Sequence, residues 1–237
     1  MAPLGRRWIA SWSKRWFDIL VVSVLLIVLA PVMLLCAMAV LLGSGFPILF
    51  RQKRVGQYGR LFWIVKFRTM RSAPGAEVTA TGDPRVNRVG RVLRRFKLDE
   101  LPQLWNVLVG EMSLVGPRPE LPSYVALHRR MYARILDLRP GVTDWASVAY
   151  RDEEDILRAH EGEPRFYDVV LLPRKLALAR LYRRRQSLCL DVRLIGATAC
   201  VAAGLRRLGS WVAGAGVVYR ARDSLSTGPG SRRRPNH

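Results

Sequence analysis

Hydrophobic positions are densest near the N-terminus, where no charged residue interrupts the sequence from Ile19 to Phe50. This run exceeds the roughly 20 apolar residues that a straight helix needs to cross a bilayer. Pro31 lies near the middle of its most apolar part. A proline inside a helix removes a backbone hydrogen bond and clashes with the preceding turn, so the pattern predicts a break or a kink at Pro31.

Two arrangements fit this run: a single kinked helix that spans the membrane, or a helix–break–helix hairpin that enters and leaves by the same face. Basic residues precede the run, and no acidic residue lies between Arg51 and Arg71 on its other side. Basic flanks tend to stay in the cytoplasm. A hairpin keeps both flanks there and a spanning helix does not, so the charges favour a re-entrant hairpin over residues 1–50.

The next segments predict a small β-hairpin followed by helices. Pro47–Arg54 and Leu61–Met70 are rich in Val, Ile, Phe and Trp, and glycines lie between them, which is typical of a hairpin. Apolar residues then recur at helical spacing. This spacing predicts helices over Val86–Phe96, from Leu101 to Leu108, over Ser123–Leu138 and over Arg174–Arg185.

Two further segments differ in polarity. Asp152–Glu163 is acidic and is expected to be a solvated, partly helical stretch, whereas Ser187–Gly204 is a second apolar run. The sequence therefore predicts a mostly helical α+β fold with a Pro-broken re-entrant membrane helix and interfacial amphipathic helices. We expect a catalytic domain over residues 51–205 and a mobile basic tail over 206–237.

The composition indicates what kind of partner the protein contacts. Half of the 237 residues are hydrophobic, yet the formal net charge is +21. A phospholipid surface is both oily and anionic, whereas nucleic acid is only anionic and is the rival partner at this stage. The three cysteines include no CxxC pair and indicate neither a disulfide framework nor a zinc site.

Asp99-Glu100 is the first candidate for chemistry. An aspartate here is a good helix N-cap, and acids suit the first turn of a helix. The pair follows directly on a strongly basic run that includes Arg94. Arginines beside carboxylates at a helix start could gather a diphosphate and a divalent cation, so both interpretations stay open.

Arg118 is the second candidate, because prolines at 117 and 119 flank it. Such a frame presents a guanidinium with little conformational entropy left to lose, although a rigid turn with an exposed arginine fits equally. The chain has only three histidines, and none forms a convincing Ser/His/Asp or Cys/His set. Attack by a carboxylate on phosphorus needs no histidine base, since Asp is ionised at neutral pH.

Together these segments resemble the bacterial sugar transferase family, the monotopic phosphoglycosyl transferases, in the minimal catalytic form. The resemblance covers about Lys14 to Ile195. Besides the basic start and the apolar helix, it rests on these motifs: Phe50–Gly56, Lys66–Met70, Asp83–Arg85, Leu98–Val107, Met112–Glu120 and Arg139–Thr143.

The resemblance implies transfer of a sugar 1-phosphate from a UDP-sugar to undecaprenyl (polyprenyl) phosphate, with release of UMP, as the first membrane step of glycan assembly such as exopolysaccharide or O-antigen. It implies that Asp99 is the nucleophile and forms a phospho-aspartyl sugar intermediate. Glu100 would help to hold Mg²⁺, while Arg94 and Arg118 match phosphate ligands.

The same resemblance implies a monotopic protein of the bacterial inner membrane, with membrane lipids as partners and the catalytic domain on the cytoplasmic face. It implies no nucleic-acid partner and leaves a homodimer open. Three residues depart from the family pattern: Ala30 replaces a Ser, Asn87 a Thr and Asp144 a Gly. Asp144 marks either a different sugar preference or only a different loop. The rival is a membrane-tethered basic protein that binds nucleic acid or acidic lipid without catalysis.

Overall fold

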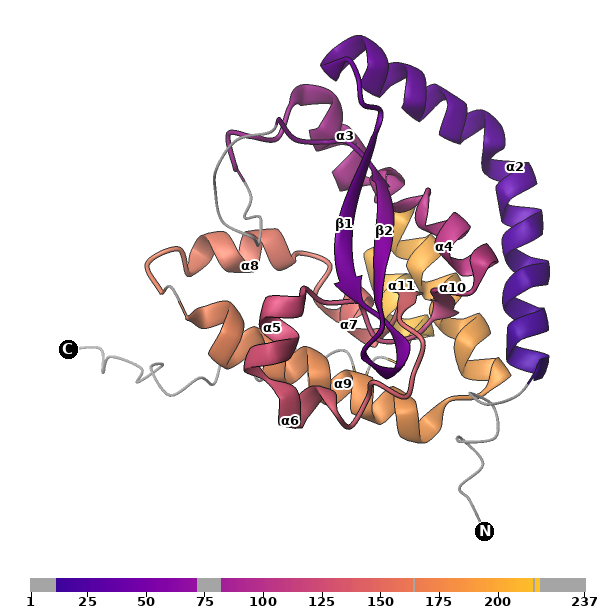
Figure 1. Ribbon diagram of the computed structural model, residues 1–237, viewed down its shortest axis with the longest axis vertical. Coiled ribbons are helices and arrows are strands. Elements are labelled where there is room, and N and C mark those ends of the chain that lie inside the picture. Colours follow the sequence, from indigo (N-terminus) through magenta and orange to yellow (C-terminus); the bar gives the residue numbers. More distant parts are fainter. Residues whose placement is uncertain (1–11, 72–81, 164, 215, 218–237) are drawn as a thin grey trace.

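The computed structural model describes residues 12–71, 82–163, 165–214 and 216–217. Its first element is a long helix, α2 (Trp12–Ser44), which wraps around one side of the molecule and changes direction part-way along (Figure 1). Pro31 lies inside α2 and does not end it. The lost hydrogen bond and the ring of Pro31 explain a bend, so the apolar run forms one bent helix rather than two helices with a gap.

The helix α2 has two different faces. Five of its residues are buried against the rest of the chain: Lys14, Asp18, Val22, Cys36 and Val40. On another face the large apolar side chains of Trp12, Trp16 and Leu20 are exposed. Positions four apart share one face of a helix, so one stripe of α2 packs on the domain while apolar side chains elsewhere on the helix remain uncovered.

The predicted β-hairpin is confirmed as β1 (Leu49–Val55) and β2 (Leu61–Phe67), which pair antiparallel across a 3₁₀ turn, η1 (Gln57–Gly59). Phe62 and Ile64 lie on one face of β2 and are buried in the main core. Because strand side chains alternate, Lys66 lies on the same face. The hairpin thus brings a lysine to the inside of the molecule.

The basic and acidic motifs fall on short helices after the hairpin. Val86–Phe96 contains α3 (Arg88–Arg95), whose N-cap Asn87 accepts a hydrogen bond from the backbone N–H of Gly90 at 2.6 Å. A 3₁₀ turn, η2 (Leu98–Glu100), leads into α4 (Gln103–Val109). Large apolar side chains on these helices are exposed, among them Val92 and Trp105, as expected of interfacial amphipathic helices.

The prediction of one helix over Ser123–Leu138 is wrong. The segment holds two short helices, α5 (Pro122–Leu127) and α6 (Arg129–Tyr132), and turns follow to Leu138. His128 separates them with φ −113° and ψ 34°, and its Nε2 pairs with the carboxylate of Asp168. Beyond this break, Tyr132, Ile135 and Leu138 are buried in the main core.

A second sheet is formed by residues that follow α4. Strands β3 (Ser113–Val115) and β4 (Gly141–Thr143) pair in parallel. The remaining elements are helical: α7 (Trp145–Ala149), α8 (Glu153–Ala159), the π-helical η3 (Tyr167–Leu171), α9 (Leu172–Arg185), α10 (Leu188–Ala202) and α11 (Arg206–Val212). The last of these begins where the tail was predicted to begin, and residues 218–237 lie outside the described residues.

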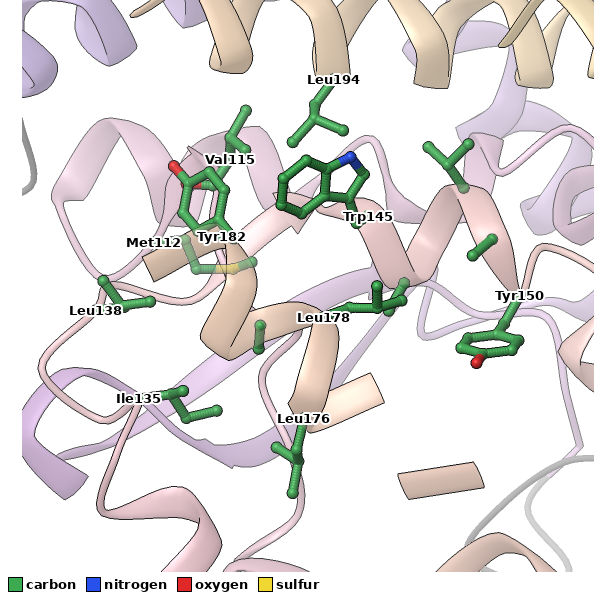
Figure 2. Packing of buried hydrophobic residues seen from close by; sticks show 14 of the residues in the cluster. Met112, Val115, Ile135, Leu138, Trp145, Tyr150, Leu176, Leu178, Tyr182 and Leu194 are labelled. Atoms are coloured by element: carbon green, nitrogen blue, oxygen red, sulfur yellow. The ribbon is translucent and has the colours of Figure 1, made fainter. Parts of the chain in front are cut away.

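The main core is assembled from parts far apart in the sequence. Figure 2 shows Trp145 at the start of α7 close to Leu194 of α10 and Tyr182 of α9, with Met112 and Val115 beside them. Trp145 Nε1 donates to the carbonyl oxygen of Ala213 at 2.7 Å, which satisfies the one polar atom of its ring. This core fixes β3, which leads to Arg118, and the strand β4 that pairs with it.

A cluster of polar side chains joins the start of α2 to the domain; we call Lys14, Asp18, Ser113, Tyr182 and Asp191 the foot cluster. Lys14 Nζ donates to Asp191 Oδ2 at 2.6 Å, and the Tyr182 hydroxyl donates to Asp191 Oδ1 at 2.8 Å. Ser113 Oγ donates to Asp18 Oδ2 at 2.8 Å. Asp191 therefore does not interrupt α10, because its buried charge is paired.

Candidate active site

Asp99 and Glu100 lie together in η2, and both side chains are buried, each 8% exposed. The turn begins after Lys97, whose φ of 57° is left-handed. No side-chain cap is formed at the start of η2 or of α4 by the described residues. Asp99 therefore is not the N-cap that its position in the sequence allowed.

Asp99 carries an unpaired acceptor. Its Oδ1 is buried and has no hydrogen-bond partner among the residues that the structure describes. Burial, together with the neighbouring charge of Glu100, raises the pKa of Asp99, while the positive charges of Lys66, Lys97 and Arg94 oppose that rise. A buried carboxylate left in this state costs free energy of folding, which is characteristic of groups kept for chemistry rather than for stability.

In contrast to Asp99, both carboxylate oxygens of Glu100 accept hydrogen bonds from basic side chains. Arg118 donates both terminal nitrogens to it, Nη1 to Oε2 at 3.2 Å and Nη2 to Oε1, and Lys66 Nζ donates to Oε1 at 3.2 Å. Burial by itself would raise the pKa of Glu100, but the charges of Arg118, Lys66 and Lys97 outweigh it and hold that pKa well below the ordinary value. Two adjacent carboxylates thus have pKa values shifted in opposite directions.

Arg118 is presented by a crossing of two backbone segments. A Cβ on Gly116 would lie 2.3 Å from the carbonyl oxygen of Arg139, and one on Gly141 would lie 2.1 Å from Gly116 N. Only glycine allows this approach. Gly116 N donates to Thr143 O at 3.0 Å and Gly141 N to Pro117 O at 2.9 Å. The crossing fixes the backbone just before Arg118, and the charge of Glu100 raises the pKa of its guanidinium further above its ordinary value.

Arg94 is near the carboxylate pair but is engaged elsewhere. Its Nε and Nη2 donate to Glu154 Oε1 of α8 at 3.1 Å and 2.5 Å. Its charge still lowers the pKa of Asp99. The structure therefore brings Asp99, Glu100 and Arg118 together, and places Arg94 within electrostatic reach of Asp99 rather than in contact with Glu100.

Sequence reasoning missed Lys66 and Glu154. Lys66 lies in a strongly apolar strand, on the same side as Phe62 and Ile64. A lysine on the buried face of a strand was the available signal, because such a charge needs a partner. Glu154 lies in the stretch expected to be solvated and partly helical, and the structure agrees, since α8 forms there and none of its residues is buried. What the sequence did not reveal is the pairing of its acids: Glu154 pairs with Arg94, and Glu153 with Lys175 at 2.9 Å.

Asp144, the third departure from the family pattern, is buried and accepts a hydrogen bond from Ser147 N at 2.7 Å. It is thus the N-cap of α7, a structural role typical of aspartate. Its charge also reaches Arg118, whose pKa it raises, although less than Glu100 does. The structure thus gives Asp144 a capping role in this loop, and an effect of Asp144 on sugar preference stays a prediction.

The donor set is compatible with Mg²⁺. No group of three or more His, Cys, Asp or Glu side chains gathers within the described ranges. Mg²⁺ at phosphate sites is commonly held by one or two carboxylates, substrate phosphates and water. Asp99 offers the unpaired Oδ1 beside Glu100, so the pair fits an ion that a bound diphosphate would complete. The assignment of Mg²⁺ to Glu100 stays a prediction.

Comparison with known proteins agrees with these motifs. The family model described as bacterial sugar transferase matches residues 9–204. The chain is 40% identical over 208 residues to an undecaprenyl-phosphate glucose phosphotransferase of Komagataeibacter xylinus, a match that covers 82% of this chain and 37% of that relative.

The names of two other relatives specify N-acetylgalactosamine in one case and glucose in the other. A UDP-N-acetylgalactosamine-undecaprenyl-phosphate N-acetylgalactosaminephosphotransferase of Aeromonas hydrophila is 43% identical over 60% of this chain and 35% of its own length. A UDP-glucose:undecaprenyl-phosphate glucose-1-phosphate transferase of Caulobacter vibrioides is 45% identical over 57% of this chain and 53% of its own length. The chain thus spans between about a third and a half of these relatives.

Proposed function

Because this chain belongs to the bacterial sugar transferase family, we propose that it transfers a sugar 1-phosphate from a UDP-sugar to undecaprenyl phosphate and releases UMP. The names of its relatives support this reaction and differ in the sugar, glucose or N-acetylgalactosamine. The product would be the lipid-linked first sugar of a glycan such as an exopolysaccharide. One phosphoanhydride replaces another, so the reaction needs no ATP.

In the proposed mechanism an oxygen of Asp99 attacks the β-phosphorus of the UDP-sugar. The bond from that phosphorus to the bridging oxygen breaks, and UMP leaves with the electron pair. An oxygen of polyprenyl phosphate then attacks the sugar-phosphoryl-Asp99, and the Asp99 carboxylate is released. Neither step requires a proton acceptor, which is consistent with a site built without histidine.

The neighbouring residues would prepare Asp99 for this role. Lys66 and Arg118 hold Glu100 in place beside it. Arg94 and Arg118 would contact the phosphates, since guanidinium groups match phosphate oxygens in geometry. Mg²⁺ held by Glu100 and Asp99 would neutralise diphosphate charge when bound.

We further propose a monotopic placement on the cytoplasmic face of the inner membrane. Among the described residues, α2 is the one helix long and apolar enough to cross a membrane by length and composition. Its buried residues lie along both of its halves, from Lys14 to Val40. A helix that contacts the same domain near both of its ends is better suited to re-enter than to cross.

Labelling can test this placement. Single cysteines introduced at positions 11 and 60 should both resist a membrane-impermeant reagent applied to intact cells and react after lysis. Modification of either one from outside would contradict the re-entrant arrangement. Pro31→Ala should straighten α2 and favour the spanning form, which the same labelling would detect.

The observation that carries the proposed reaction is the buried, unpaired Oδ1 of Asp99 beside a fully engaged Glu100. Purified protein should be mixed with a panel of UDP-sugars in the absence of lipid acceptor and examined by mass spectrometry. We expect a mass increase of one sugar phosphate, located on the Asp99 peptide and absent from Asp99→Asn. A modified peptide without Asp99, or an active Asp99→Asn protein, would overturn the mechanism.

The same assay separates the enzyme from a basic binding protein. A protein that only binds nucleic acid or acidic lipid releases no UMP from any UDP-sugar. That alternative explains the charge of +21 but gives no reason to bury Asp99 with an unpaired oxygen. The panel also identifies the preferred sugar.

A further inference from the structure

The edge of the Arg94 guanidinium that could bind a phosphate through two N–H donors is occupied by the carboxylate of Glu154. Glu154 Oε1 accepts from both Nε and Nη2 of Arg94, and Nη1 lies 3.3 Å from Met70 Sδ. Carboxylates and phosphates bind a guanidinium through the same parallel N–H donors. A phosphate that approached this edge of Arg94 would therefore meet Glu154 already in place.

The helix α8, which carries Glu154, makes few buried contacts with the rest of the protein. None of the residues of α8 is buried, and only Ile156 and Leu157 pack against the main core, partly covered. Figure 1 shows α8 at the edge of the molecule, away from the core helices α7 and α10. Few buried contacts mean a low cost of local displacement.

The two ion pairs of α8 differ in burial. The side chains of Lys175 and Glu153 are 8% and 26% exposed, whereas those of Arg94 and Glu154 are 18% and 37% exposed. The first pair is costly to break, because it would leave a buried charge alone. The second pair is cheap to break, because water can solvate Glu154.

We propose that Glu154 occupies the anionic subsite of the substrate on Arg94, and that the diphosphate of a UDP-sugar displaces it while Glu153–Lys175 keeps α8 attached. This inference rests on the proposed function for the identity of the substrate. Glu154 is thus a residue that sets nucleotide-sugar affinity: it neutralises Arg94 in the empty site and competes with the ligand for it.

The test measures binding of UDP by calorimetry, independently of turnover. Glu154→Gln keeps the size of the side chain but weakens its hold on Arg94, so the Kd for UDP should fall about two- to fivefold, the range of an exposed ion pair. Glu161→Gln is the matched control, because Glu161 is exposed and forms no ion pair with the described residues. It should leave the Kd unchanged.

A double-mutant cycle assigns the effect to Arg94. In an Arg94→Ala background UDP should bind more weakly, and Glu154→Gln should then have no further effect. Hydrogen exchange should also show faster exchange of α8 amides when UDP is added to the wild-type protein. Weaker UDP binding by Glu154→Gln, additive effects in the cycle, or unchanged exchange in α8 would each overturn the inference.

These results are separate from the proposed reaction. UMP release by the wild-type protein decides whether it is a transferase, whereas the UDP affinities decide whether Glu154 competes for Arg94. A wild-type protein that releases UMP, with a Glu154→Gln variant of unchanged affinity, would retain the proposed function and reject the competition.

Discussion

Two buried charge clusters of this protein differ in how their carboxylates are satisfied. In the foot cluster all four oxygens of Asp18 and Asp191 accept hydrogen bonds, from Ser113, Leu114, Tyr182 and Lys14. At the candidate site Glu100 is equally engaged, but Asp99 Oδ1 is left without a partner in the described structure. The foot cluster joins α2 to the domain, and the unpaired oxygen marks where chemistry is proposed.

The largest expected effect is on activity at Asp99. Asp99→Asn should lower UMP release by about 10³-fold or more, as loss of a nucleophile does. The free energy of unfolding should stay the same or rise, because the neutral amide removes an unpaired buried charge. Chemical denaturation in detergent checks stability beside the activity assay. A loss of stability would instead indicate that Asp99 has a structural role, like the acids of the foot cluster.

The foot cluster should respond in the reverse way. Asp191→Ala removes the carboxylate that accepts from the buried Lys14 ammonium at 2.6 Å, while Asp18 Oδ1 stays 3.9 Å from it, and should cost about 3–5 kcal/mol of stability. Replacing both, as Lys14→Met with Asp191→Leu, should recover most of this loss, because an apolar pair carries no desolvation penalty. Denaturation midpoints of the single and double variants measure the difference. A double variant as unstable as the single one would contradict this account.

Arg118 should show an intermediate effect. Arg118→Ala removes a charge-assisted contact worth roughly 1.5–3 kcal/mol, about ten- to a hundredfold in activity. Arg118→Lys should recover only part of it, since a lysine cannot donate in a bidentate fork. Activity within twofold of the wild type in folded Arg118→Ala protein would make the Pro-flanked turn only structural.

The smallest effect is expected in the pH dependence. Burial, together with Glu100, raises the pKa of Asp99, so UMP release should fall as pH drops through a midpoint above the ordinary aspartate value of about 4. Lys66 opposes that rise. Lys66→Met should therefore shift the acid limb to still higher pH. A shift to lower pH would show that Lys66 does not act on Asp99.

Much of the architecture follows from local sequence. The bent helix α2, the hairpin β1–β2 and the helices α3, α4 and α9 were predictable, because hydrophobic spacing and proline act over neighbouring residues. The helix over Ser123–Leu138 was not, since the break at His128 depends on contacts with Asp168 and the core. Local pattern cannot report a partner forty positions away.

The sequence by itself determined which residue types are present at the site: adjacent carboxylates at 99 and 100, and a proline-framed arginine at 118. Only the tertiary structure decided which of these charged groups are paired and with which partners. Lys66 comes from a strand, Arg118 from a glycine crossing and Glu154 from α8, and these contacts settle which acid is paired and which arginine is occupied. Burial and charge pairing are properties of three-dimensional neighbours, and spacing along a chain does not contain them.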